Sequence, residues 1–185
     1  MIKNKFVKLL SLFLLSKDWW YLFNKAKLKG VDSCWDYACR IKLRLQGSYI
    51  GHNASFESEP CFPHGVTGCF ISGGGYIGAN CVIFQQVTIG SNTLSDTKSA
   101  GAPVIGDNCY IGAGAKIIGN VTIGNNCRIG ANAVVTKDVP DNSTVISGEM
   151  RIIKKNEKMD NRFRCLNKDG KIVYYKDGQW FEETK

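Results

Sequence analysis

The sequence predicts an all-β fold in which the chain winds into a parallel β-helix. Aliphatic residues recur every six positions, and most of them are followed directly by glycine. This period fits neither an α-helix nor a plain alternating strand, but it matches one short strand plus one turn. Cysteine recurs two positions before several of these residues, which marks a second inward-facing position. The in-phase residues are Ile71, Ile77, Ile83, Ile89, Ile105, Ile111, Ile117, Ile123, Ile129 and Val135.

The repeat defines a central domain over residues 49–148. Three hexads make one triangular coil, and stacked coils bury a continuous core. The Ile50-Gly51 pair marks an imperfect first coil, and counting from there gives about five coils. Glycine after the aliphatic residue relieves crowding where the backbone bends. A β-sandwich would need the same spacing to arise by coincidence, so a β-helix is the better interpretation.

The cysteines predict core packing rather than metal or disulfide chemistry. The chain has eight cysteines but two histidines, and no C-x-x-C pair. Half of the cysteines fall in the small inward-facing slot of the repeat and are interpreted as core filler. We therefore expect free thiols, a reducing compartment and no metal site. The four in-phase residues are Cys69, Cys81, Cys109 and Cys127.

The period breaks once, between Ile89 and Ile105. The gap equals one hexad plus a polar, turn-rich excursion over residues 91–102. A loop that leaves a rigid repeat is a common place for function, and a tolerated insertion is the alternative.

Residues 1–48 are predicted to be a basic helical segment, with ten Lys/Arg against three Asp/Glu in a chain of net charge +8. No nucleic-acid-binding motif accompanies this charge, so we expect no nucleic-acid partner. Residues 2–28 combine lysines with Trp, Phe and Leu, which suits a helix on an anionic membrane surface. Packing on the protein's own β-helix is the favoured alternative. No cleavage site follows the short apolar run, so we expect a cytoplasmic protein, with contact at the inner face of the membrane as a further expectation.

Residues 149–185 are predicted to form a small β extension. Two Lys-Asp-Gly turns, at 168–170 and 176–178, flank an aromatic strand. This pattern is typical of a β-meander, which we expect to cover the open end of the β-helix.

Longer strings within the repeat resemble the left-handed β-helix acetyltransferases, which use acetyl-CoA as cosubstrate. The resemblance covers about residues 49–153 and is most specific to serine acetyltransferases and their relatives in capsule and lipopolysaccharide gene clusters. It implies a left-handed coil and a homotrimer with active sites between subunits. The matching strings are Phe62-Pro-His-Gly-Val-Thr-Gly-Cys-Phe-Ile71, Gln86-Val-Thr-Ile-Gly90, Ile105-Gly-Asp-Asn108, Ile111-Gly-Ala-Gly-Ala-Lys-Ile-Ile-Gly119 and Ile129-Gly-Ala-Asn-Ala-Val-Val-Thr-Lys-Asp-Val-Pro140.

The resemblance implies that His64 is the general base. Attack of a hydroxyl on a thioester needs a base within hydrogen-bond reach, and imidazole, which titrates near ~6.5, suits that task. The family pairs this histidine with an aspartate, whose position here is near Tyr49. Glu57 and Glu59 are the nearest acids, and either is a candidate to orient His64. His52, at the ragged start of the repeat, is interpreted as structural.

The resemblance also implies an acetyl-CoA site between coils of neighbouring subunits. Small side chains there let the pantetheine arm approach the backbone, and cations meet its phosphates. The corresponding residues are Ala113, Ala131, Thr136, Lys137, Arg151 and Lys154.

Departures from serine acetyltransferases decide the predicted acceptor. Their second histidine, in the excursion, is replaced by Ala102, their aspartate is missing, and their long helical N-terminal domain has only residues 1–48 as its counterpart. We therefore predict an acetyl-CoA-dependent O-acetyltransferase acting on a sugar hydroxyl of a surface polysaccharide or its precursor. Serine O-acetylation in cysteine biosynthesis is the alternative. A non-enzymatic β-helix with a structural or assembly role is an alternative of another class.

Overall fold

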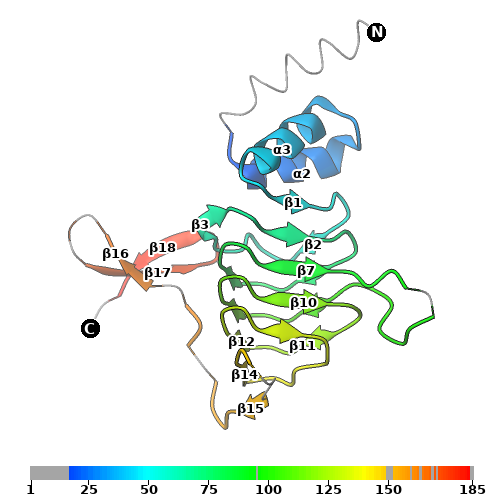
Figure 1. Cartoon of the computed structure of the whole chain (residues 1–185). Coiled ribbons are helices and arrows are strands. Elements are labelled where there is room, and N and C mark those ends of the chain that lie inside the picture. The colour runs from blue at the N-terminus through cyan, green and yellow to red at the C-terminus, as the bar shows by residue number, and fades with distance from the viewer. Residues whose placement is uncertain are drawn as a thin grey trace, which may run out of the picture.

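The computed structural model describes residues 17–94, 96–148, 152–158, 160–162, 164–167, 169 and 171–183. Within them, two helices precede a prism of short parallel strands, and a separate antiparallel sheet follows (Figure 1). Successive strands along the chain belong to different faces of the prism, and each pairs in parallel with the equivalent strand of the next coil. This topology confirms the predicted all-β parallel β-helix.

The prism has three faces, each a stack of parallel strands. Face A consists of β1 (Tyr49–Ile50), β4 (Phe70–Ile71), β7 (Thr88–Gly90), β10 (Lys116–Ile118) and β13 (Val134–Val135). Face B consists of β2 (Ser55–Phe56), β5 (Tyr76–Ile77), β8 (Val104–Ile105) and β11 (Thr122–Ile123). Face C consists of β6 (Val82–Ile83), β9 (Tyr110–Ile111), β12 (Arg128–Ile129) and β14 (Ser143–Val145). The strand β3 (Pro63–Val66) runs from face C toward face A in the first coil.

The repeated aliphatic residues form the core of the prism, as the six-residue period predicts. Each of the ten is at most 1% exposed. Parallel pairing aligns them in vertical columns, so that Ile83, Ile111 and Ile129 stack in register on face C. The four in-phase cysteines are also buried, and their thiols donate to backbone carbonyls, as Cys109 Sγ does to Gly124 O at 3.2 Å. The burial of these four cysteines confirms their interpretation as core filler, and all eight cysteines of the chain are free thiols.

Turns between the faces form three edges, which we name C–A, A–B and B–C after the faces they join. The B–C edge repeats a left-handed asparagine, which tolerates positive φ because its short polar side chain bonds locally. Asn108 Nδ2 donates to Asn126 Oδ1 at 2.8 Å, and Asn126 Nδ2 donates to Asn142 Oδ1 at 3.1 Å. Side-chain amides therefore form a ladder along this edge.

The predicted excursion leaves the prism at the A–B edge, where Figure 1 shows it as a long green loop. Asn92 and Gly101 close its base through two backbone hydrogen bonds of 2.9 Å. The Asn92 side chain also donates to Thr97 and Ser99 at 2.9 Å each. The loop is therefore an ordered hairpin-like insertion that leaves the repeat on either side undisturbed.

Two helices close the N-terminal end of the prism (Figure 1). Helix α2 (Trp19–Lys29) starts at Asp18, whose side chain accepts from Tyr21 N–H at 2.7 Å, and helix α3 (Cys34–Leu45) starts at Ser33. Leu22 and Leu43 are buried in the same hydrophobic cluster as the repeat. The sequence predicts a helix over residues 2–28, and α2 occupies the described end of that range, whereas residues 2–16 lie outside the described part. The second helix, α3, follows after a break at 30–33.

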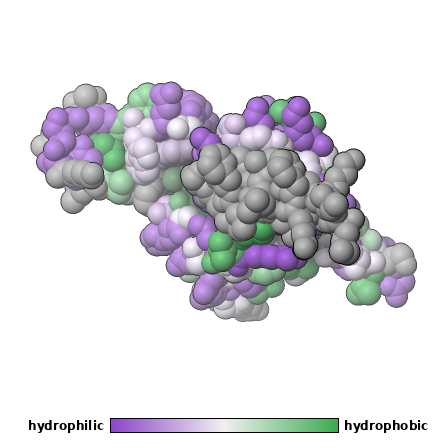
Figure 2. Space-filling model, turned by 90° about the horizontal axis from the view of Figure 1, so that it is seen from above, coloured by the Kyte–Doolittle hydropathy of each residue, from purple (hydrophilic) through white to green (hydrophobic). Residues whose placement is uncertain are grey.

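The aromatic side chains of α2 pack against aromatic residues of the first coil. Trp19 packs edge-on against Phe62 at 5.3 Å between ring centroids, and Trp20 packs against Phe56 at 5.7 Å. This is the packing on the protein's own β-helix that the sequence favours over a membrane surface. In the view from above, the part of the surface that is not covered by grey atoms is mixed, with hydrophilic residues beside separate groups of hydrophobic ones (Figure 2). Among the described helices, none is long and apolar enough to cross a membrane.

The C-terminal extension forms the predicted β-meander. Its strands β16 (Arg164–Leu166), β17 (Ile172–Lys176) and β18 (Gln179–Glu182) pair in antiparallel order. The expectation that it covers the open end of the prism is wrong, because the meander lies beside the prism (Figure 1). The edge of β14 is instead paired by the antiparallel strand β15 (Ile152–Lys154).

Candidate active site

His64 lies on β3 at the C–A edge, and its side chain is exposed. Its Nδ1 is 2.8 Å from the side-chain oxygen Oε1 of Gln85, which belongs to the next coil. An amide oxygen only accepts hydrogen bonds, so Nδ1 carries the proton and Nε2 keeps its lone pair. The ring also packs edge-on against Phe84 at 5.6 Å. His64 is thus held in one tautomer with Nε2 available as a base.

The two acidic candidates lie elsewhere. Glu57 accepts a hydrogen bond from the hydroxyl of Tyr76 at 3.2 Å. Glu59 is partly buried, and this burial, with Asp18 nearby, raises the pKa of its carboxyl group. Within the described residues, neither carboxylate contacts His64. The position beside Nδ1 is occupied by the neutral amide of Gln85, which the sequence interpretation missed although it directly precedes the Gln86-Val-Thr-Ile-Gly90 string.

His52 has the structural surroundings that the sequence predicts. Its Nδ1 is 3.8 Å from Asp36 Oδ1, and Asp36 is buried and pairs with Arg40 Nη2 at 2.7 Å. This cluster ties α3 to the first coil, away from the C–A edge.

Two of the predicted cofactor residues share the C–A edge with His64. Ala113 and Ala131 occupy the equivalent turn in later coils, where Gly114 N–H donates to Gln85 O at 3.0 Å and Asn132 N–H donates to Ala113 O at 2.8 Å. Coils of a parallel sheet are spaced by about 4.8 Å, so these turns form a continuous row that leads to His64. Small side chains along this row leave the backbone open to an extended ligand.

The remaining predicted cofactor residues lie apart from that row. Thr136 and Lys137 follow β13 and lie exposed at the A–B edge, the edge that also carries the excursion. Ala102, at the end of the excursion, is on the same edge. Lys154 is exposed on β15, and Arg151 lies outside the described residues. Within one chain, face A therefore separates the row of His64 from the pair Thr136-Lys137.

Comparison with known proteins finds that the repeat is similar to bacterial transferases. Residues 102–137 match the family model described as bacterial transferase hexapeptide (six repeats). The serine acetyltransferase of Bacillus pumilus is 41% identical over 86 residues, which cover 46% of this chain and 39% of that protein. The serine acetyltransferase of Staphylococcus aureus is 33% identical over 142 residues, covering 68% and 65%, respectively.

Solved structures of serine acetyltransferases are also similar to this chain. A crystal structure of Neisseria gonorrhoeae serine acetyltransferase superposes with a TM-score of 0.63 and 28% identity over 74% of this chain and 51% of that one. The complex of that enzyme with serine gives a TM-score of 0.60 at 28% identity, over 71% and 52% of the two chains. This chain spans less than two thirds of each of these relatives. It thus carries the hexapeptide repeat of bacterial transferases on the left-handed β-helix fold that it shares with serine acetyltransferases.

Proposed function

We propose that this protein transfers an acetyl group from acetyl-CoA to the hydroxyl of serine, with His64 as general base. The observation that carries the proposal is the hydrogen bond of Nδ1 to Gln85, which leaves Nε2 free at the start of the row formed by Ala113 and Ala131. The similarity to serine acetyltransferases, 33% to 41% over the two relatives described, supports the choice of acceptor.

This proposal corrects the sugar acceptor predicted from the sequence. That prediction rested on residues missing relative to serine acetyltransferases, whereas the similar proteins and structures are themselves serine acetyltransferases. The missing aspartate also loses its weight as an argument, because Gln85 supplies the partner of Nδ1 in its place. A polysaccharide acceptor is therefore not supported.

The chemistry follows from the free Nε2. This nitrogen accepts the proton of the serine hydroxyl as the oxygen attacks the thioester carbonyl carbon. Collapse of the tetrahedral intermediate breaks the C–S bond, and the imidazolium returns its proton to the leaving sulfur. The Gln85 carbonyl keeps the ring orientation through the cycle without adding a negative charge beside it.

Gln85 is expected to set the pH dependence of the reaction. Gln85→Leu removes the acceptor for Nδ1–H and should lower kcat by about tenfold, since the loss of one orienting hydrogen bond costs about 1–2 kcal/mol. Gln85→Glu keeps an acceptor but adds a charge that stabilises the imidazolium, so the acid limb of the kcat/KM profile should move up by about one pH unit. Identical profiles for wild type and Gln85→Glu would contradict this role.

The arrangement of the predicted cofactor residues supports a homotrimer with shared sites. Ala113 lies at the C–A edge and Lys137 at the A–B edge, so one acetyl-CoA that touches both must bridge two edges of the prism. When prisms pack side by side, the C–A edge of one chain lies against the A–B edge of its neighbour. Face A also presents exposed apolar side chains at Tyr49, Phe70 and Val134, which suits contact with a second copy.

Subunit mixing tests the shared site. His64→Ala and Lys137→Glu chains, each inactive or weak alone, should regain activity when co-assembled, because about a quarter of randomly formed interfaces then combine two intact edges. The measurement is the activity of trimers isolated through a different tag on each chain. Trimers of two differently tagged His64→Ala chains are the control. If mixed trimers show no gain, the site is built from one chain.

Direct assay decides the overall proposal. The purified chain with acetyl-CoA and L-serine should release free CoA and form O-acetylserine, measured by a thiol reagent and by mass spectrometry. Binding of acetyl-CoA without serine-dependent release would reject serine as acceptor, and absence of both would favour a non-enzymatic β-helix.

A further inference from the structure

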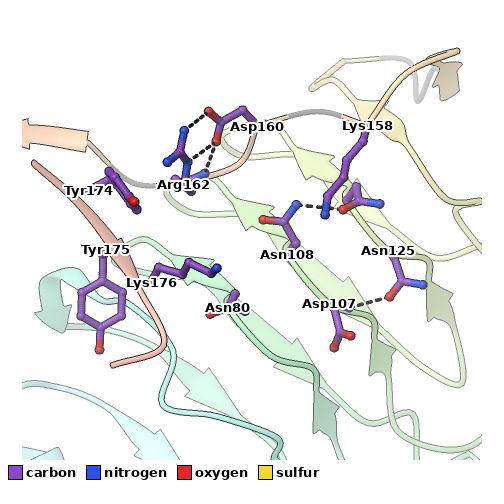
Figure 3. Close-up of a pocket in the computed structure, with 11 residues that line it drawn as sticks. Asn80, Asp107, Asn108, Asn125, Lys158, Asp160, Arg162, Tyr174, Tyr175 and Lys176 are labelled. Carbon is purple, nitrogen blue, oxygen red and sulfur yellow. Dashed lines mark hydrogen bonds and ion pairs between the residues drawn. The ribbon is translucent and has the colours of Figure 1, made fainter. Parts of the chain in front are cut away.

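A polar cleft of about 730 Å³ lies along the B–C edge, between the asparagine ladder and the C-terminal meander (Figure 3). This edge is distinct from the C–A edge that carries His64, so the cleft is separate from the proposed acetyl-transfer site. Its volume is in the range of small-molecule sites. The lining residues are Asn80, Asp107, Asn108, Asn125, Asn126, Lys158, Asp160, Arg162, Tyr174, Tyr175 and Lys176.

Hydrogen bonds hold both walls of the cleft onto its floor. Asn161 is 2% exposed; its Nδ2 donates to the carbonyls of Asn108 and Cys127, and its Oδ1 accepts from Arg128 Nε at 2.9 Å. These bonds fix the wall that contains Lys158 and residues 160–162. The other wall is fixed at its tip, where Asp177 N–H donates to Asn80 Oδ1 at 3.0 Å. The cleft is therefore preformed rather than left between loosely placed segments.

Of the two carboxylates of the cleft, Asp160 is ion-paired and Asp107 accepts a hydrogen bond from the backbone. Asp160 forms a two-pronged pair with Arg162 at 2.9 and 3.0 Å, and this guanidinium also lies over the Tyr174 ring at 4.1 Å. Asp107 Oδ1 accepts from Ala79 N–H at 2.8 Å. Lys158 forms no ion pair with any residue that the structure describes, and Lys176 reaches only Asp177, at 3.7 Å. The lining residues carry three cationic and two anionic side chains, so the cleft has one more positive than negative charge, and Lys158 is its cation without an ion pair among the described residues.

The side-chain amides contribute donors rather than acceptors. Asn80 Oδ1 accepts from Asp177 N–H, and Asn125 Oδ1 accepts from Asp107 N–H at 2.8 Å. Their Nδ2 groups have no partner among the described residues. Two ammonium groups and two amide N–H₂ groups thus surround one cavity, and such donors are complementary to a group rich in acceptor oxygens.

We propose that this cleft binds the phosphate group of a small phosphorylated molecule. A phosphate offers three acceptor oxygens and a double negative charge, so it can satisfy Lys158, Lys176 and the amide donors at once, which a single carboxylate does not. Both lysine side chains are exposed, so a ligand can reach them from solvent.

Calorimetric titration of the full chain with inorganic pyrophosphate, in the presence of saturating CoA, tests the proposal. Wild type should bind one pyrophosphate per chain, and the double variant Lys158→Met/Lys176→Met should bind about a hundredfold more weakly, since each charged hydrogen bond is worth about tenfold. Lys155→Met, which removes one positive charge from the same segment outside the cleft, should bind as wild type does.

A second variant separates geometry from charge. Asn161→Ala removes no charge, but it frees the wall that carries Lys158 and should also weaken pyrophosphate binding by tenfold or more. Equal binding by the double lysine variant, or equal affinity for succinate, would overturn the phosphate site. Binding of pyrophosphate without CoA but not in the presence of saturating CoA would overturn the independence of the site from the cofactor. His64→Ala should leave binding unchanged, so the result does not depend on acetyl transfer.

Discussion

Replacing His64 with alanine is expected to lower kcat for acetyl transfer by about 10²- to 10⁴-fold, the usual contribution of a positioned general base. The serine hydroxyl would then have to lose its proton to water during attack on the thioester. The KM for acetyl-CoA should change little, because Ala113, Ala131 and Lys137 supply the proposed contacts with the cofactor. The measurement is the rate of CoA release with serine at saturation.

The matched control is His52→Ala. His52 is bound to Asp36 at the N-terminal end of the prism, so its loss should leave kcat within about twofold of wild type. Retention of full activity by His64→Ala would reject the proposed mechanism, and equal losses in both variants would point to a general effect on folding.

The largest effect on stability is expected from Ile111→Ala. Ile111 is fully buried and stacks between Ile83 and Ile129 in the middle of the prism. Rigid neighbouring coils prevent the cavity from closing, so the variant should lose about 2–5 kcal/mol of unfolding free energy. Urea unfolding followed by circular dichroism measures this loss.

Val104→Ala provides the comparison on the outer surface. Val104 lies on face B and is 42% exposed, so its truncation leaves no cavity and should cost less than about 1 kcal/mol. If the two variants lost equal stability, the stacked aliphatic column would not be the main source of cohesion in the prism.

The sequence predicts the prism well because its information is local and repeated. Each hexad, marked by a pair such as Ile111-Gly112, specifies its own strand and turn, and the same pattern recurs in every coil. The end of α2 agrees with the helix predicted to residue 28, but the separate helix α3, which starts at Ser33 after Gly30 has turned the chain with a positive φ of 84°, has no repeated pattern from which its bounds could be predicted.

Features that depend on distant pairs could not be predicted. The partner of His64 lies 21 positions away and becomes a neighbour only when successive coils stack. A hydrogen bond between Asp177 and Asn80, which are 97 positions apart, holds the meander beside the prism. The periodicity of the sequence does not predict such a contact. The acceptor was predicted wrongly because the second histidine and the aspartate of serine acetyltransferases are missing from the sequence, whereas the contact of Gln85 with His64, which takes the place of the aspartate, is visible only in the structure.

The burial of the cysteines divides the thiols into two chemical classes. Burial raises the pKa of Cys39 and Cys61 to about 12. Side-chain hydrogen bonds between neighbouring core cysteines, together with burial, raise the pKa of Cys109 and Cys127, so these four sulfurs hold almost no reactive thiolate at neutral pH. Cys165, in contrast, is exposed on β16 of the meander. In a Cys34→Ser chain, which lacks the partly exposed thiol of α3, a maleimide dye would therefore label the meander and report optically on the neighbouring cleft.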